Sequence, residues 1–198
     1  KYMAGAFSYQ LTGNNVVGVH YRALDTGSMN ETTVMEPGGT GRSFSWKDMA
    51  VGVSYATFLT ERFSFGANIN WIKEGVDLYD YSSSTWSVDL GTYYVTGFNT
   101  LKLGMNIRNF GPELDFNETF EDYNNGESEE MPESFRPYHM PLIFQIGLCY
   151  ELFESLPEHK LILAVDGVHP NDASERINLG GEYTYLDLLS VRAGMYTN

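Results

Sequence analysis

The chain is dominated by short segments in which apolar and polar side chains alternate. Residues 62–72 place Phe63, Phe65, Ala67, Ile69 and Trp71 on one face and Ser64, Gly66, Asn68 and Asn70 on the other. The same alternation is seen in residues 101–109, 142–150 and 188–197. A helix would scatter these side chains around its axis, whereas a strand sorts them onto two faces. The period therefore predicts β-strands, about ten of them along the chain.

The connections between these strands alternate between short and long. The other predicted strands are residues 2–11, 16–24, 46–59, 85–95, 159–168 and 175–185. Short connections lie at 12–15, 60–61, 97–100, 153–158 and 186–187, and longer, mostly polar ones at 25–45, 75–84, 111–140 and 169–174. This is the pattern of an up-and-down transmembrane β-barrel, whose short turns face the periplasm and whose long loops are extracellular.

Composition supports the membrane barrel over a soluble β-sandwich, which would show the same alternation. Aromatic residues make up 15% of the chain and charged residues only 19%, and there are 20 glycines. The polar faces of the predicted strands are rich in Gly, Asn and Ser rather than Lys and Glu. Aromatics near strand ends predict an interfacial girdle; they are Trp46, Trp71, Tyr79, Tyr81, Trp86, Tyr94, Tyr183 and Tyr185.

Charge and motifs exclude several classes of function. A net charge of −14 argues against a nucleic-acid partner. Cys149 is the single cysteine, so no internal disulfide can form. The four histidines lie on different segments without metal-ligand spacing, and no nucleophile elbow is present. We therefore expect no metal site, no cofactor and no enzymatic activity.

Both ends of the chain are strand-like, since one predicted strand begins at residue 2 and another ends at residue 197. Residues 1–198 are thus expected to form the internal portion of a single barrel domain. A complete barrel begins and ends in the periplasm. The orientation of the loops therefore predicts an odd number of further strands on each side.

A series of motifs resembles the PorV/PorQ family of outer-membrane proteins. The motifs are Asp89-Leu90-Gly91-Thr92-Tyr93, Leu103-Gly104-Met105-Asn106-Ile107-Arg108-Asn109-Phe110-Gly111, Val53-Ser54-Tyr55-Ala56, Leu59-Thr60-Glu61-Arg62-Phe63-Ser64-Phe65-Gly66, Asp166-Gly167-Val168-His169-Pro170-Asn171-Asp172, Glu175-Arg176-Ile177-Asn178-Leu179-Gly180-Gly181-Glu182-Tyr183 and Val191-Arg192-Ala193-Gly194. Each is weak alone, but their order and spacing together are specific, and they span nearly the whole chain.

The resemblance implies a fourteen-stranded FadL-like barrel, of which about four strands lie outside this sequence. It also implies a role in the type IX secretion system of Bacteroidetes. PorV-like members carry secreted substrates from the translocon to an attachment complex by holding the substrate's C-terminal domain. PorQ-like members belong to the attachment machinery. The resemblance does not separate these two roles.

The two longest loops are the predicted partner-binding surface. The candidate contact residues are Met29, Met35, Arg42, Glu121, Asp122, Glu129 and Glu130. The 111–140 loop carries a run of acids without a basic residue between positions 113 and 133, and a solvated loop would show the same composition. Its 122–133 segment roughly follows calcium-loop spacing. However, Glu127 stands where the sharp turn needs Gly.

Five charged residues within predicted strands are expected to face the barrel lumen, because an unpaired charge facing lipid costs a few kcal/mol. They are Asp89, Arg108, Asp166, Glu182 and Arg192. One interpretation is a structural network of ion pairs and hydrogen bonds that fills the interior. The other is a path for a polar ligand or an ion.

Three functions fit these observations. The first is an outer-membrane component of type IX secretion that binds substrate C-terminal domains or translocon and attachment-complex proteins through its extracellular loops. The second is a FadL-like channel for hydrophobic or small molecules. The third is a structural barrel of a surface assembly. In each of them the chain contacts outer-membrane lipid.

Overall fold

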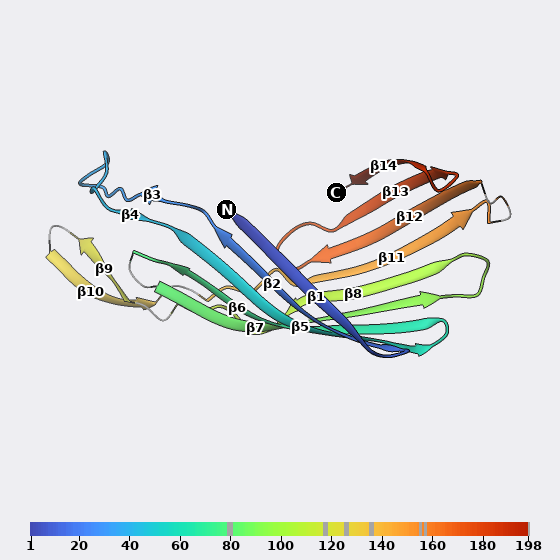
Figure 1. The fold of residues 1–198 in the computed structure, drawn as a ribbon. Helices are drawn as coiled ribbons and strands as arrows, with labels where there is room; N and C mark the ends of the chain where they lie inside the picture. Colours follow the sequence, from blue (N-terminus) through green and yellow to red (C-terminus); the bar gives the residue numbers. More distant parts are fainter. Residues whose placement is uncertain are drawn as a thin grey trace.

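The structure, a computed structural model, describes residues 1–78, 81–116, 119–124, 127–134, 137–154, 156 and 158–197. Its main feature is a curved, 10-stranded antiparallel sheet in which every strand neighbours the next long strand of the chain (Figure 1). The strands are β1 (Tyr2–Thr12), β2 (Asn15–Asp25), β5 (Trp46–Thr60), β6 (Phe63–Val76), β7 (Tyr81–Val95), β8 (Lys102–Phe110), β11 (Ile143–Leu152), β12 (His159–Pro170), β13 (Arg176–Tyr185) and β14 (Leu189–Thr197). The predicted all-β, up-and-down fold is confirmed.

The short turns gather at one end of the sheet, and two small hairpins extend from the other (Figure 1). The hairpins are β3 (Met29–Asn30) with β4 (Ser43–Phe44), and β9 (Thr119–Asn124) with β10 (Glu127–Ser134). The described residues include no helix long and apolar enough to cross a membrane.

The predicted loop at 75–84 is wrong, because β6 and β7 continue through most of it. Gly75 pairs with Ser82, and Val76 pairs with Tyr81. The serines of this segment made it look like a loop. Ladder pairing uses only backbone groups, so a polar segment without proline extends the sheet equally well.

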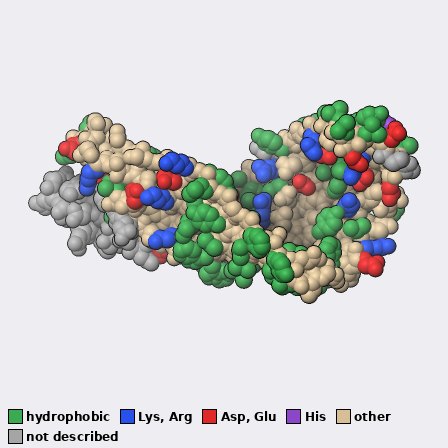
Figure 2. All heavy atoms as spheres, in the orientation of Figure 1, with side chains coloured by type: hydrophobic (Ala, Val, Ile, Leu, Met, Phe, Trp, Pro, Cys, Tyr) green, Lys and Arg blue, Asp and Glu red, His purple; other side chains and the backbone are tan. Residues whose placement is uncertain are grey.

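The register of the ladder sorts side chains into an apolar face and a polar face. One cross-strand row consists of Phe7, Val19, Val53, Ile69 and Val88. A neighbouring row on the opposite face consists of His20, Gly52, Asn70 and Ser87. We call the apolar face outer and the polar face inner. Figure 2 shows hydrophobic side chains gathered over the lower middle of the view, with charged side chains towards its two ends and around the hollow between them.

The distribution of exposure is the reverse of that in a soluble sandwich. Large apolar side chains of the outer face, such as Val53 and Ile69, are exposed. Among the described residues, the buried hydrophobic side chains are Ala50, Leu114, Phe116, Met140 and Val168. A contiguous exposed apolar surface of this size needs an apolar medium to cover it. This favours lipid contact over a solvated sheet.

Two aromatic rows border the apolar part of the outer face. Trp71 pairs with Trp86 towards the loop end, and Phe63 pairs with Tyr94 towards the turn end. The rows are separated by about 26 Å along each strand, at about 3.3 Å per residue. At a barrel tilt of about 40° this gives a band about 20 Å tall, close to the apolar band of outer-membrane barrels. Tyr79, also expected in the girdle, lies outside the described residues.

A carboxylate at the loop end fastens the start of β5 to the end of β6. Asp77 accepts hydrogen bonds from the backbone N–H and the hydroxyl of Ser45, both at 2.7 Å, and lies 3.3 Å from the Lys47 ammonium. These contacts stabilise the ionised carboxylate and lower the pKa of Asp77 from 3.8 to about 2, with the hydrogen bonds from Ser45 as the main cause.

This contact should resist mild acid. Because the pKa of Asp77 is lowered in the folded chain, its stabilising effect is complete above about pH 4 and is lost as the pH falls towards 2. In a protein whose Trp71 and Trp86 are replaced by Phe, we expect Trp46 fluorescence to stay constant down to about pH 3 and to change below it. The Asp77→Asn variant should lack this transition. The same transition in both proteins would contradict the assignment.

Candidate functional site

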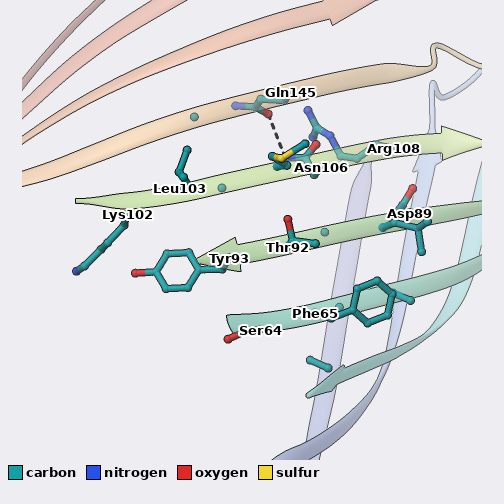
Figure 3. Close-up of a pocket in the computed structure, with 18 of the residues that line it drawn as sticks. Ser64, Phe65, Asp89, Thr92, Tyr93, Lys102, Leu103, Asn106, Arg108 and Gln145 are labelled. Atoms are coloured by element: carbon teal, nitrogen blue, oxygen red, sulfur yellow. Dashed lines mark hydrogen bonds between the residues drawn. The ribbon is translucent and has the colours of Figure 1, made fainter. Parts of the chain in front are cut away.

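The inner face of the sheet forms a trough of about 700 Å³ that spans β5 to β8, β11 and β12 and is lined by both polar and apolar groups (Figure 3). Its polar and charged lining residues at inner-face positions are Ser54, Ser64, Asn68, Asp89, Tyr93, Lys102, Asn106, Arg108, Gln145 and Asp166. Apart from one bulge in β8, their strands alternate regularly between the two faces, so the registers hold these side chains on one concave surface.

A hydrogen-bonded chain starts at Asp89 and crosses the first half of this face. One carboxylate oxygen of Asp89 accepts from the Asn70 amide at 3.0 Å and from Asn68 at 3.4 Å. Since the Asn70 amide nitrogen donates to Asp89, its amide oxygen is the acceptor for His20 Nε2, 2.8 Å away. The neutral ring therefore carries its proton on Nε2, and Ser54 Oγ lies 3.4 Å from Nδ1.

Gly52 makes the bond between His20 and Asn70 possible. These residues lie on β2 and β6, with Gly52 between them on β5. A Cβ at Gly52 would lie 2.4 Å from His20 Cε1 and 2.5 Å from Asn70 Oδ1. The absent side chain leaves the space in which the two polar groups meet across the intervening strand.

A β-bulge in β8 holds the other oxygen of Asp89. Val88 pairs with Phe110 and Leu90 with Ile107, so two residues of β8, Arg108 and Asn109, oppose Asp89 alone. Asn109 adopts a φ of 60°, and its backbone N–H donates to Asp89 Oδ1 at 2.8 Å. Asn is one of the few residues that enters this left-handed region readily. Because of the bulge, both carboxylate oxygens of Asp89 accept a hydrogen bond.

The second half of the inner face carries two further polar links. Asn106 donates to Gln145 at 3.4 Å, and Gln145 donates to Asp166 at 3.3 Å. Farther along, the guanidinium of Arg192 pairs with Glu182. Together with the chain from Ser54 to Asp89, these links form what we call the polar belt. It extends from β2 to β14.

The structure places all five residues predicted for the lumen on the inner face. They do not form one connected network of charges. Glu182 and Arg192 form an ion pair, whereas amides hold Asp89 and Asp166. Arg108 makes no ion pair with any described residue. The sequence analysis identified the charges but missed the amides that bind them. Asn70 and Gln145 could have been found, because both occupy inner positions of the period-2 pattern.

Two cationic side chains in the trough are therefore available to a ligand. Lys102 and Arg108 lie on the same strand and both line the trough (Figure 3). Within the described part of the chain, neither forms an ion pair. Between them, Asn106 has a buried amide oxygen with no hydrogen-bond partner among the described residues. A ligand with both accepting and donating polar groups would satisfy this set.

The ends of the 111–140 loop lie on the inner wall rather than outside the sheet. Ser83 Oγ on β7 donates to the Asp115 carbonyl at 2.7 Å, and Thr85 Oγ1 lies 3.5 Å from the Pro112 carbonyl. Gly111 passes so close to β7 that a Cβ there would lie 2.1 Å from the Trp86 carbonyl oxygen. Residues 111–116 and 137–141, the two stems of this loop, thus lie against the inner face on the loop side of the trough.

The stems carry the small apolar core of the molecule. Leu114 is 1% exposed and pairs with Tyr138 through two backbone hydrogen bonds of 2.9 and 3.0 Å. Phe116 stacks on Tyr138 and contacts Trp46, with ring centroids 6.4 and 5.9 Å apart. Trp46 therefore lies at the stems, not in the girdle predicted for it. Apolar side chains within so acidic a loop were the signal available in the sequence.

Tyr138 connects these stems to β6. Its hydroxyl donates to the carboxylate of Glu74. Burial, followed by the bond to Glu74, raises the pKa of the Tyr138 phenol. The phenol therefore remains protonated at every physiological pH and can donate to Glu74 throughout this range.

The candidate contact residues in the loops fall into three groups. Met29 is partly exposed, and Met35 is 89% exposed at the tip of its loop. Arg42 forms a bidentate ion pair with Glu31 at 2.8 and 3.0 Å, which holds its loop together. The backbones of Glu121, Asp122, Glu129 and Glu130 belong to β9 and β10. The side chains of these four residues lie outside the described part of the structure.

The residues of the calcium-like spacing also belong to this hairpin, and Gly126 lies outside the described residues. Elsewhere in the described chain, no group of three His, Cys, Asp or Glu side chains is arranged to hold a metal ion.

Comparison with known proteins identifies the fold but no sequence family. The sequence matches no protein-family model and no curated protein. The structure is similar to the crystal structure of the Pseudomonas putida toluene transporter TodX, with a TM-score of 0.60 and 12% sequence identity. The match covers 98% of this chain and 67% of TodX. The fold is that of a FadL-like barrel. The sheet thus corresponds to a large part of a barrel wall.

Gly52 offers a test of the polar belt. We expect Gly52→Ala to separate His20 from Asn70 and to leave polar groups unpaired, at a cost of about 1–3 kcal/mol in stability. Gly66→Ala is the matched control, because a Cβ there has its nearest contact at an ordinary 3.7 Å. Thermal unfolding of the detergent-solubilised full-length protein measures both. Equal melting temperatures for the two variants would contradict the role of Gly52.

Proposed function

We propose that the chain forms part of the wall of an outer-membrane channel for small molecules. The observation that carries this proposal is the combination of an exposed apolar outer face with a trough of about 700 Å³ on the inner face, which carries charged and amide side chains. The fold of a toluene transporter supports it. In this arrangement lipid covers the outer face, the long loops are extracellular and the trough is the path for the solute.

The lining of the trough favours solutes that carry a polar or anionic group on a small apolar body. Lys102 and Arg108 offer positive charge, while Asn106 and Gln145 offer neutral hydrogen-bonding groups. The carboxylates of Asp89 and Asp166 are held by amides. These hydrogen bonds occupy acceptor oxygens but leave the negative charge in place, so we expect an anionic group of the solute to bind at Lys102 and Arg108 rather than near the carboxylates.

The stems of the 111–140 loop narrow the entrance to this path. They lie across the inner side of β7, and residues 81–87 of that strand continue past the last residue that pairs with β8. In the described part of the sheet, this segment of β7 has a strand partner only on its β6 side. Movement of the stems would thus open the trough towards the extracellular side, next to a step in the wall.

Substitution of Arg108 tests both the channel function and the preference of the channel for anionic solutes. We expect Arg108→Gln to reduce the flux of benzoate about tenfold, which corresponds to about 1.4 kcal/mol, while toluene flux stays unchanged. Flux is measured in proteoliposomes that contain the full-length protein. Arg62→Gln, in a turn at the other end of the strands, is the control for the loss of one positive charge. A wild-type protein that conducts neither solute would refute the channel function.

The second candidate function is that of a component of type IX secretion. It is supported by exposed apolar side chains at one loop tip. Val34 is 98% exposed and Met35 89% exposed at one loop tip. Apolar side chains presented in this way are typical of protein recognition. Together with the PorV/PorQ resemblance, this supports a barrel that binds secreted C-terminal domains or translocon proteins. The assignment to this family remains a prediction.

Partner capture tests this second function. We expect a Val34→Ser, Met35→Ser double variant to lose partners that wild-type full-length protein retains in a mild-detergent pull-down from native outer membranes. Recovery of proteins that share a C-terminal β-domain, or of a large translocon barrel, would support the secretion function. Identical recoveries from wild type and variant would exclude the loop tip as the contact.

A further inference from the structure

The outer face changes from apolar to basic within two cross-strand rows at the loop end. The last aromatic row contains Trp71 and Trp86. The next row towards the loops aligns Met49, Lys73 and Ser84. In the row beyond it, Lys47 pairs with Gly75 on one side and with Asp25 on the other. The boundary between hydrocarbon and headgroups is expected at the tryptophan row.

Lys47 and Lys73 are the only Lys or Arg residues on the outer face of the ten long strands as the structure describes them. All other basic residues of these strands fall on the inner face of the same registers. The two lysines lie on adjacent strands as diagonal neighbours, with Cβ atoms about 7 Å apart. In a chain of net charge −14 this pair is a local concentration of positive charge just above the girdle.

The acidic groups near this pair are already engaged. Asp77 accepts two hydrogen bonds from Ser45 besides its contact with Lys47 at 3.3 Å. Asp25 accepts the backbone N–H of Gly27 at 2.7 Å. Lys73 is exposed and forms no ion pair with a described residue. An anion at the surface would therefore meet Lys73 without a competing carboxylate and would share Lys47 with Asp77.

We propose that Lys47 and Lys73, above the Trp71–Trp86 pair, bind the phosphate group of a glycolipid of the lipid A class in the outer leaflet. The proposal rests on the outer-membrane placement made above. A phosphate at headgroup level lies within reach of lysines whose aliphatic stems run along the apolar face. The acyl chains of the same lipid would cover Val53 and Ile69 in the rows below. Charge and apolar surface thus match the two parts of one amphiphile.

The phosphate requirement can be tested on the full-length protein in mild detergent by native mass spectrometry. Bisphosphorylated lipid A, its dephosphorylated form and inorganic phosphate are the probes. We expect wild-type protein to retain the phosphorylated lipid at least tenfold better than the dephosphorylated one. A Lys47→Gln, Lys73→Gln double variant should lose this preference. Lys160→Gln, close to a short turn at the opposite end, should keep it.

Single variants of Lys73 and a competition experiment distinguish a specific lipid site from general anion binding. Lys73→Gln alone should weaken the binding of bisphosphorylated lipid A, whereas Lys73→Arg should retain it, since arginine keeps the positive charge. Undiminished binding by the double variant would overturn the proposal. Competition by inorganic phosphate at the same concentration as lipid A would also overturn it, because the site would then recognise free anions rather than a lipid.

Membrane fractionation and solute flux separate this inference from the proposed function. The lysine variants should remain in the outer membrane and conduct benzoate as the wild type does, because neither lysine lines the trough. A protein absent from the outer membrane would refute the placement itself. A protein that is present and conducts, but binds lipid without regard to the lysines, would refute only the lipid site.

Discussion

The fixed register of the backbone ladder is the constraint on which the rest of this structure depends. Because side chains alternate across a strand, each register assigns every residue to the outer or the inner face, and a slip by one residue would exchange the two. The apolar rows, the girdle, the trough and the lysine pair all follow from one set of strand pairings. His20 and Asn70, which are fifty residues apart in the chain, meet only because both pair with Gly52.

On the inner face, some charged side chains are held by hydrogen bonds, whereas others have no ion-pair partner among the described residues. Amides and a backbone N–H satisfy the carboxylate of Asp89, so it needs no cation from the lumen. Arg108, directly beside it on the bulge, forms no ion pair with a described residue. β7 extends beyond the last residue that pairs with β8. There the loop stems place Leu114 and Phe116 against the inner face. The only compact apolar core in the described chain therefore belongs to the loop stems, not to the sheet.

The sequence predicted the ten strands well because period-2 patterning reports directly on the faces of a strand. It failed at residues 75–84, where serines on paired strands resembled a loop. It also failed to place Trp46, because position near a strand end does not show which face a side chain takes. The contact of residues 111–116 with β7 depends on the hydroxyls of Ser83 and Thr85, which lie 32 and 27 residues from their partners in the sequence. No sequence pattern marks these two hydroxyls as loop contacts. Pairing between amides and acids across strands likewise requires the register.

The bulge at Arg108 and Asn109 inverts the parity of β8. Up to Ile107, odd-numbered residues of this strand face outwards, whereas beyond the bulge the even-numbered Phe110 does. The extra residue thus resets the inside–outside phase of everything that follows on the strand. If the same sequence formed a regular strand without the bulge, Asn109 would face outwards, Phe110 would turn into the lumen and Gly111 would face the lipid, so the stem that follows would start on the wrong side of the wall. The starting point of the stem therefore depends on this one bulge.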